Sequence, residues 1–109
     1  MSLVISITTV ESVKEVLADS LAVIFKHSTR CPISAGAKRE FDQFAEAYNG
    51  EGKLYLVDVI ANRAVSGEIS SQTGVIHQSP QVLVVRNGSV AWHASHWSIT
   101  QKALRDAVE

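Results

Sequence analysis

Short continuous apolar runs along the chain predict buried β-strands. The clearest is Leu21–Phe25, whose branched and aromatic side chains are typical of a strand covered on both faces. Asn87-Gly88 predicts a tight hairpin between the last two strands. The predicted strands are residues 21–25, 54–59, 81–86 and 89–94, and we also consider a short strand over residues 3–7.

Segments with helical spacing of apolar side chains lie between these strands. The segment after Pro32 is the clearest, because Phe41, Phe44 and Tyr48 fall on one helical face. Two segments fit capping boxes, with Thr8 and Ser98 as the expected N-caps. The predicted helices are residues 9–19, 33–48 and 62–73, followed by a last helix that begins after Ser98.

The order of these elements predicts a single α/β domain. Helices and strands alternate up to a terminal hairpin, so we expect a mixed sheet, parallel at first, with helices on both faces. No linker, internal repeat or charge block divides residues 1–109. The predicted architecture is therefore one three-layer α/β/α domain with a mixed central sheet.

Composition and charge exclude several classes of function. Ten basic and eleven acidic residues give a net charge of −1, without the excess that nucleic acid or an anionic membrane requires of a partner. No apolar run approaches the length of a transmembrane helix, and the N-terminus lacks the pattern of a signal peptide. We therefore expect a cytoplasmic protein. The single cysteine excludes an internal disulfide and a cysteine-based zinc finger.

That cysteine, Cys31, lies between the first buried strand and a predicted helix start. Pro32 follows it, and proline fits the first turn of a helix. A helix N-terminus favours thiolate over thiol, and Arg30 and Lys26 add positive charge nearby. Ser34 is placed to face the sulfur through its hydroxyl or its N–H. A lone cysteine is more often an inert buried side chain, but this position is polar and accessible, so Cys31 is the candidate nucleophile.

Ser79-Pro80 comes directly before a predicted buried strand, where proline fits the first position. The local sequence leaves two interpretations open. One is a trans proline that only starts the strand. The other is a cis proline whose preceding carbonyl faces Cys31 and pairs with an extended substrate. His77 is a candidate for a polar wall of the same cleft, with a plain surface role as the alternative.

The remaining candidates are Trp92, His93 and His96, which lie close together in the sequence. Two histidines and Cys31 could supply three zinc ligands, but no fourth is evident, so no metal is predicted. We expect this cluster to pack the last strand onto the final helix or to line a surface near the active site. The chain has no glycine-rich phosphate loop and no serine-nucleophile motif.

Three segments carry a distinctive combination of residues. They are His27-Ser28-Thr29-Arg30-Cys31-Pro32-Ile33-Ser34, His77-Gln78-Ser79-Pro80-Gln81 and Trp92-His93-Ala94-Ser95-His96. Together they resemble the signatures of the monothiol bacilliredoxin family, also called YtxJ-like, within the thioredoxin-like fold. The likeness extends over about residues 8–107. The chain differs from thioredoxins, and from bacilliredoxins with a C-G-C motif, because Ser34 stands in place of a second active cysteine.

The resemblance implies that Cys31 is the attacking residue and that Pro80 is the cis proline of the fold. It also implies a thiol–disulfide oxidoreductase that removes bacillithiol, or a similar low-molecular-weight thiol, from protein mixed disulfides. The expected partners are S-thiolated client proteins and a small thiol or reducing partner. No bound cofactor is expected, because the small thiol acts as a co-substrate.

Two other functions stay open on the sequence. One is a binding module with a thioredoxin-like scaffold that engages partners without catalysis or through an iron–sulfur cluster shared in a dimer. The other is a redox sensor in which Cys31 is capped under oxidising conditions without turnover. Monothiol glutaredoxins that bind glutathione carry a C-G-F-S motif and a Gly-Gly turn, and this chain has neither.

Overall fold

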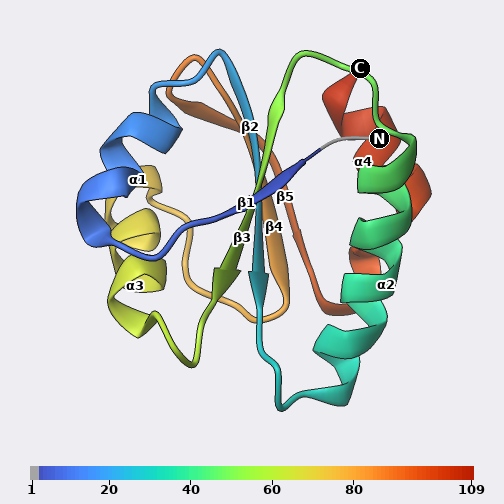
Figure 1. Cartoon of the computed structure of the whole chain (residues 1–109), viewed down its shortest axis with the longest axis horizontal. Coiled ribbons are helices and arrows are strands. Elements are labelled where there is room, and N and C mark those ends of the chain that lie inside the picture. Colours follow the sequence, from blue (N-terminus) through green and yellow to red (C-terminus); the bar gives the residue numbers. More distant parts are fainter. Residues whose placement is uncertain (1–2) are drawn as a thin grey trace.

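The computed structural model describes residues 3–109, in which a five-stranded sheet is covered by two helices on each face (Figure 1). The strands are β1 (Val4–Ser6), β2 (Leu21–His27), β3 (Lys53–Asp58), β4 (Gln81–Arg86) and β5 (Ser89–Ser95). The helices are α1 (Val10–Leu17), α2 (Pro32–Ala47), α3 (Arg63–Thr73) and α4 (Gln101–Val108), and the short 3-10 helix η1 (His96–Ser98) joins β5 to α4. The predicted three-layer α/β/α architecture is confirmed.

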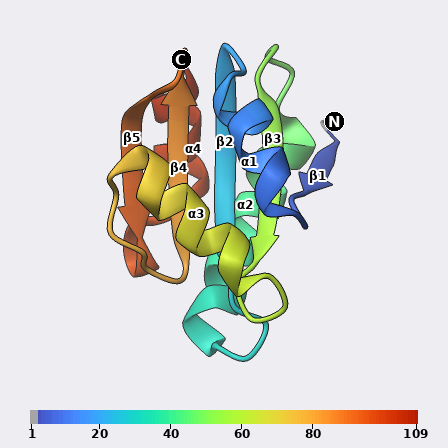
Figure 2. The same ribbon diagram turned by 90° about the vertical axis from the view of Figure 1, so that its left-hand side faces the viewer.

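The strands are arranged in the order β1-β3-β2-β4-β5 (Figure 2). Strand β3 is parallel to β1 and β2, whereas β4 is antiparallel to both β2 and β5. The sheet is therefore mixed, as the order of elements predicts. Strand β2 lies at its centre, and the five residues 22–26 of this strand are buried because helices cover both faces.

The two faces of the sheet form two separate apolar cores. Ala22 and Ile24 of β2 belong to the core beneath α1 and α3. Val23 and Phe25 belong to the core beneath α2 and α4. Successive side chains of a strand point to opposite faces, so this alternation sends Lys26 toward α3 and His27 toward α2. Strand β2 thus continues two residues past the apolar run that predicts it.

Both helices that were expected to start with capping boxes begin later than predicted. Helix α1 is capped by Thr9 rather than Thr8, because the Thr9 hydroxyl accepts a hydrogen bond from the Ser12 N–H. Helix α4 is capped by Thr100, and Ser98 lies in η1 instead. Each predicted cap has a second hydroxyl residue one or two positions further on. Since both residues have the same capping chemistry, the sequence alone does not select between them.

Candidate active site

The carboxyl ends of β2 and β3 and the amino end of β4 lie at one edge of the sheet, at the bottom of Figure 1. Cys31 lies at this edge as the N-cap of α2, with extended backbone and a partly exposed side chain. Its carbonyl accepts the Ala35 N–H at 3.0 Å, which anchors the residue to the helix. Pro32 follows at the first helical position, where its missing N–H removes no intrahelical bond. The thiol therefore lies at a helix N-terminus, a place that favours an anion.

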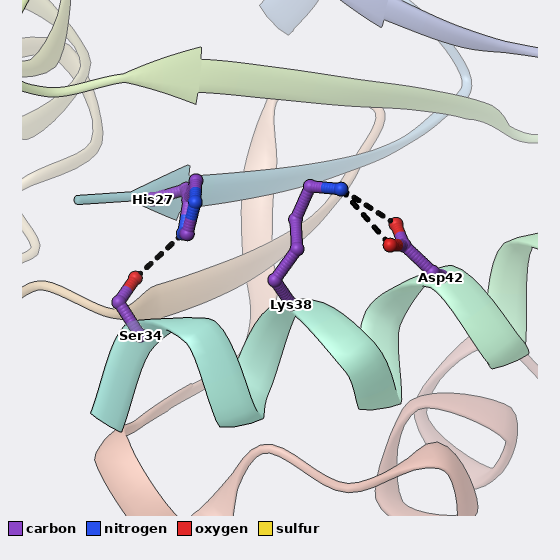
Figure 3. A network of polar contacts seen from close by, with 4 residues as sticks. All are labelled: His27, Ser34, Lys38 and Asp42. Carbon is purple, nitrogen blue, oxygen red and sulfur yellow. Dashed lines mark hydrogen bonds and ion pairs between the residues drawn. The ribbon is translucent and has the colours of Figure 1, made fainter. Parts of the chain in front are cut away.

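The buried Ser34 hydroxyl is held by two residues at the end of β2, one of which, His27, is drawn in Figure 3. It accepts a hydrogen bond from the Ser28 N–H at 2.9 Å and lies 2.7 Å from His27 Nδ1. Sequence reasoning places Ser34 opposite the sulfur and leaves His27 without a role. In the structure, these hydrogen bonds make His27 a site residue that the sequence analysis missed. The alternation of side chains along β2 could have identified His27, because it places this residue on the sheet face that α2 covers.

The environment of His27 favours the neutral form of its ring. Burial lowers the pKa of His27 from 6.5, and the Lys38 charge adds to this effect, while Asp58 and Asp42 partly oppose it. Lys38 forms an exposed ion pair with Asp42 on the next turn of α2, at 2.9 Å (Figure 3). A neutral imidazole has one donor and one acceptor nitrogen, so His27 and Ser34 exchange a single hydrogen bond.

The Ser79–Pro80 peptide bond is cis, as the resemblance implies. Pro80 is buried directly before β4, and its carbonyl accepts the His96 N–H at 3.1 Å. The buried Gln81 side chain donates to the Ile76 carbonyl at 3.1 Å, which ties the loop before Pro80 to the start of β4. The Ser79 hydroxyl is buried and finds no hydrogen-bond partner within residues 3–109. The proline loop is thus anchored to β4 and to η1.

Trp92, His93 and His96 occupy three different environments. Trp92 packs against the core beneath α2 and α4, which agrees with the expectation that the cluster packs the last strand onto the final helix. His93 is exposed and lines a shallow hollow with Gln78 and Gln81 near the proline loop. His96 is exposed at the start of η1 with a φ of 55°. Among residues 3–109, no three His, Cys, Asp or Glu side chains are grouped to hold a metal ion.

Lys26 was expected to add positive charge near Cys31, but its amine lies at α3 instead. Its side chain is fully buried beneath α3, and its Nζ donates to the Ser66 carbonyl at 3.1 Å and to the Ser70 hydroxyl at 3.0 Å. A third, longer contact of 3.4 Å joins Nζ to His77 Nδ1. Burial lowers the pKa of Lys26 to about 8. Arg30, in contrast, is exposed in the turn before Cys31.

His77 lies on the loop between α3 and Pro80, and it is bonded to the same group of side chains. Its Nδ1 lies 2.9 Å from the Ser66 hydroxyl as well as facing Lys26. Because an amine donates, Nδ1 accepts, and the ring proton lies on Nε2. Burial lowers the pKa of His77, and the charge of Lys26 adds to this effect. His77 is part of the wall of a hollow of about 410 Å³, together with Val59, Ile60, Arg63, Ser66 and Gly67.

Replacing Lys26 with methionine is expected to flatten the dependence of stability on pH above pH 8. The pKa of Lys26 is about 8 in the folded protein against 10.5 for an unperturbed lysine. The unfolded chain therefore binds more protons between these values, and the free energy of unfolding rises with pH by at most about 1.4 kcal/mol per pH unit. Urea unfolding across this range measures the slope. Lys14→Met, at an exposed position of α1, is the control and should keep it; an unchanged slope in Lys26→Met would contradict the burial of this amine.

Together, the fold, the thiol at a helix N-terminus and the cis proline at the same edge define a thioredoxin-fold protein with a single cysteine at this edge. The chain belongs to the family described as Monothiol bacilliredoxin BrxC, whose family model matches residues 5–104. The family resemblance of the three sequence segments is confirmed. Family and fold give the chain the role of a thiol oxidoreductase.

Solved structures agree with this assignment. One protein, whose description suggests an oxidoreductase with a thioredoxin fold, is 31% identical with a TM-score of 0.87, over 97% of this chain and 94% of its own. A thioredoxin of Malassezia sympodialis matches 99% of this chain and 90% of its own at 19% identity and a TM-score of 0.75. A thioredoxin of Trypanosoma brucei brucei matches 97% of this chain and 88% of its own at 21% identity and a TM-score of 0.77. These two thioredoxins show the shared fold.

The helices of the described region are short or polar. Within residues 3–109, none has the length and apolar character that crossing a lipid bilayer requires.

Proposed function

We propose that this protein is an enzyme that removes bacillithiol, or a similar low-molecular-weight thiol, from protein mixed disulfides in the cytoplasm. The observation that carries the proposal is the position of Cys31, the single thiol of the chain. It is partly exposed, caps α2, and lies at the sheet edge that also holds the cis Pro80. Membership of the monothiol bacilliredoxin family supports this reaction over other thiol chemistry.

In the first step, the Cys31 thiolate attacks the sulfur of the small thiol within the mixed disulfide. A new S–S bond forms between Cys31 and the small thiol, and the bond to the client sulfur breaks. The client sulfur leaves with the electron pair and takes up a proton from water. The client is reduced and Cys31 is oxidised to a mixed disulfide, so this step consumes no further oxidant or reductant.

In the second step, a thiol from another molecule must regenerate Cys31. A second small thiol, or the thiol of a reducing partner, attacks the adduct and leaves as a disulfide with the first small thiol. Ser34 occupies the position where a second active cysteine would resolve the adduct, and a hydroxyl cannot form a disulfide. The small thiol is therefore a co-substrate, and no bound cofactor takes part.

Exposed apolar side chains near the cis Pro80 in the chain support a protein as the client. Ile76, before the cis proline, is 81% exposed, and Trp97, in η1, is 77% exposed. The hydrogen bond from the His96 N–H to the Pro80 carbonyl joins the two segments that carry them. Large apolar side chains left in water at neighbouring positions are typical of a protein-binding surface. The Ser79 carbonyl is proposed to pair with the extended client chain, at the end of the sheet that also carries the exposed Arg30 and Pro32.

Turnover on two capped clients tests the proposal. The same client protein is capped with bacillithiol or with glutathione, and release of the client thiol is followed with an excess of the matching free thiol. We expect many turnovers on the bacillithiol-capped client and at least about tenfold slower release from the glutathione-capped client, since this chain lacks the glutathione-binding turn. One release per protein molecule without turnover would favour a redox sensor, and no release from either client would contradict the proposed function.

A further inference from the structure

The strongest unexplained feature outside the thiol site is the buried amine of Lys26. All three of its partners, the Ser66 carbonyl, the Ser70 hydroxyl and His77 Nδ1, are neutral acceptors. Within residues 3–109, no carboxylate forms an ion pair with it. Buried charges in proteins are normally paired with an opposite charge, because neutral acceptors alone do not compensate for lost hydration. Lys26 thus lacks a counter-ion that its surroundings would favour.

The hollow next to Lys26 has room for such a counter-ion. Two of the residues that contact Lys26, Ser66 and His77, also form the wall of the hollow of about 410 Å³, which we name the α3 hollow. Arg63, the first residue of α3, lines it too and is exposed, with no carboxylate partner in the described part of the chain. An anion in the α3 hollow would contact Arg63 directly. Ser66 and His77 would lie between the anion and the Lys26 amine.

The acidic residues around the α3 hollow do not occupy this place. Asp58 pairs in register with His27, so its side chain lies on the α2 face of the sheet, and its Oδ1 accepts the N–H groups of Ile60 and Ala61. Glu68 of α3 is bonded to Gln72 one turn further along. The charges that face the hollow are therefore positive.

The α3 hollow adjoins the edge of the sheet that carries Cys31. Val59 lines the hollow, and its N–H donates to the carbonyl of His27, four residues before Cys31, at 3.0 Å. His77, which also lines the hollow, lies three residues before the cis Pro80. The segment after β3 thus links the α3 hollow to the end of β2 that leads to Cys31.

From this arrangement we infer that the α3 hollow binds a carboxylate group of the small thiol that is joined to Cys31. Arg63, and the Lys26 amine behind the neutral Ser66 and His77, form the cationic side of this subsite. The inference rests on the proposed function, because it assigns the recognition of the small thiol in the reaction of Cys31. The subsite is expected to select thiols that carry a carboxylate over uncharged thiols of the same length.

Two substitutions at Gly67, to aspartate and to asparagine, test the charge of the α3 hollow, because the two side chains have nearly the same shape and only aspartate is charged. Gly67 lines the hollow, and a Cβ atom added there meets no atom within 4 Å, so aspartate and asparagine both fit. The probes are the symmetrical disulfides of mercaptohexanoate, which carries a carboxylate, and of mercaptohexanol, which is uncharged. Intact mass spectrometry follows the rate at which Cys31 takes up each thiol. In each reaction one S–S bond breaks and one forms at Cys31, with the second thiol as leaving group.

We expect Gly67→Asp to react about five- to tenfold more slowly than Gly67→Asn with the mercaptohexanoate disulfide, and within about twofold with the mercaptohexanol disulfide. Arg63→Gln should show about a fivefold loss for the charged probe alone, while Arg105→Gln, an exposed arginine of α4, should behave as wild type. High salt should reduce these differences. Equal effects on both probes, or none, would overturn the subsite and leave the proposed function standing. Failure of wild-type Cys31 to react with either probe would instead overturn the proposed function.

Discussion

Replacing Cys31 with serine is expected to reduce the removal of small thiols to the uncatalysed rate. Cys31 is the only thiol in the sequence, so no other side chain can form the mixed disulfide. The measurement is release of the client thiol from a bacillithiol-capped client, with wild-type protein and buffer alone beside it. The expected loss is complete within the sensitivity of the assay.

The fold of Cys31→Ser is expected to stay intact. Cys31 caps α2 without a side-chain hydrogen bond, and serine is among the preferred N-cap residues. The variant should therefore be at least as stable as wild type, and a thermal unfolding curve checks this. Release of client thiol above the buffer rate by the folded Cys31→Ser variant would show that another group performs the reaction.

Replacing Ser34 with cysteine is expected to convert the one-thiol reaction into one with internal resolution. Position 34 lies in the first turn of α2, three residues after Cys31, where thioredoxins carry their second active cysteine. A thiol at this position attacks the adduct on Cys31 within the same molecule, and intramolecular attack is far faster than attack by dilute external thiol. The lifetime of the adduct should fall by about 100-fold or more at micromolar external thiol. Rapid quenching followed by intact mass measurement gives the lifetime.

Ser34→Ala is the matched control for this experiment. Both substitutions remove the hydroxyl that accepts the Ser28 N–H and contacts His27, so both should lower stability by about 1–3 kcal/mol. Only the cysteine variant adds a thiol. An adduct that lives as long in Ser34→Cys as in Ser34→Ala would mean that position 34 does not face the Cys31 sulfur, against the proposed mechanism.

The position of the thiol is predictable from sequence because local signals determine it. The apolar run of β2, Pro32 at a first helical turn and the amphipathic segment after it place Cys31 at a helix start without knowledge of the remaining chain. The mixed sheet follows in the same way, from alternating elements and the Asn87-Gly88 hairpin. These features depend on residues that are neighbours in the sequence.

Lys26 and His27 are not predictable in the same way. Both are polar and follow an apolar run, which favours the end of a strand and exposed side chains. Lys26 is buried instead because α3, some 40 residues further on, supplies the Ser66 carbonyl and the Ser70 hydroxyl as acceptors. His27 gains its role because Ser34 turns its hydroxyl back toward β2. Such contacts appear only when separate elements are packed together.

The most direct test of the central claim is the mass of the protein after one encounter with a bacillithiol-capped client. Equal amounts of the two proteins are mixed without free thiol and quenched, and both masses are measured. We expect Cys31 to gain the mass of one bacillithiol as the client loses it, in equal amounts. Release of the client thiol with Cys31 unmodified, or a covalent complex that joins Cys31 to the client itself, would contradict the proposed attack on the small-thiol sulfur.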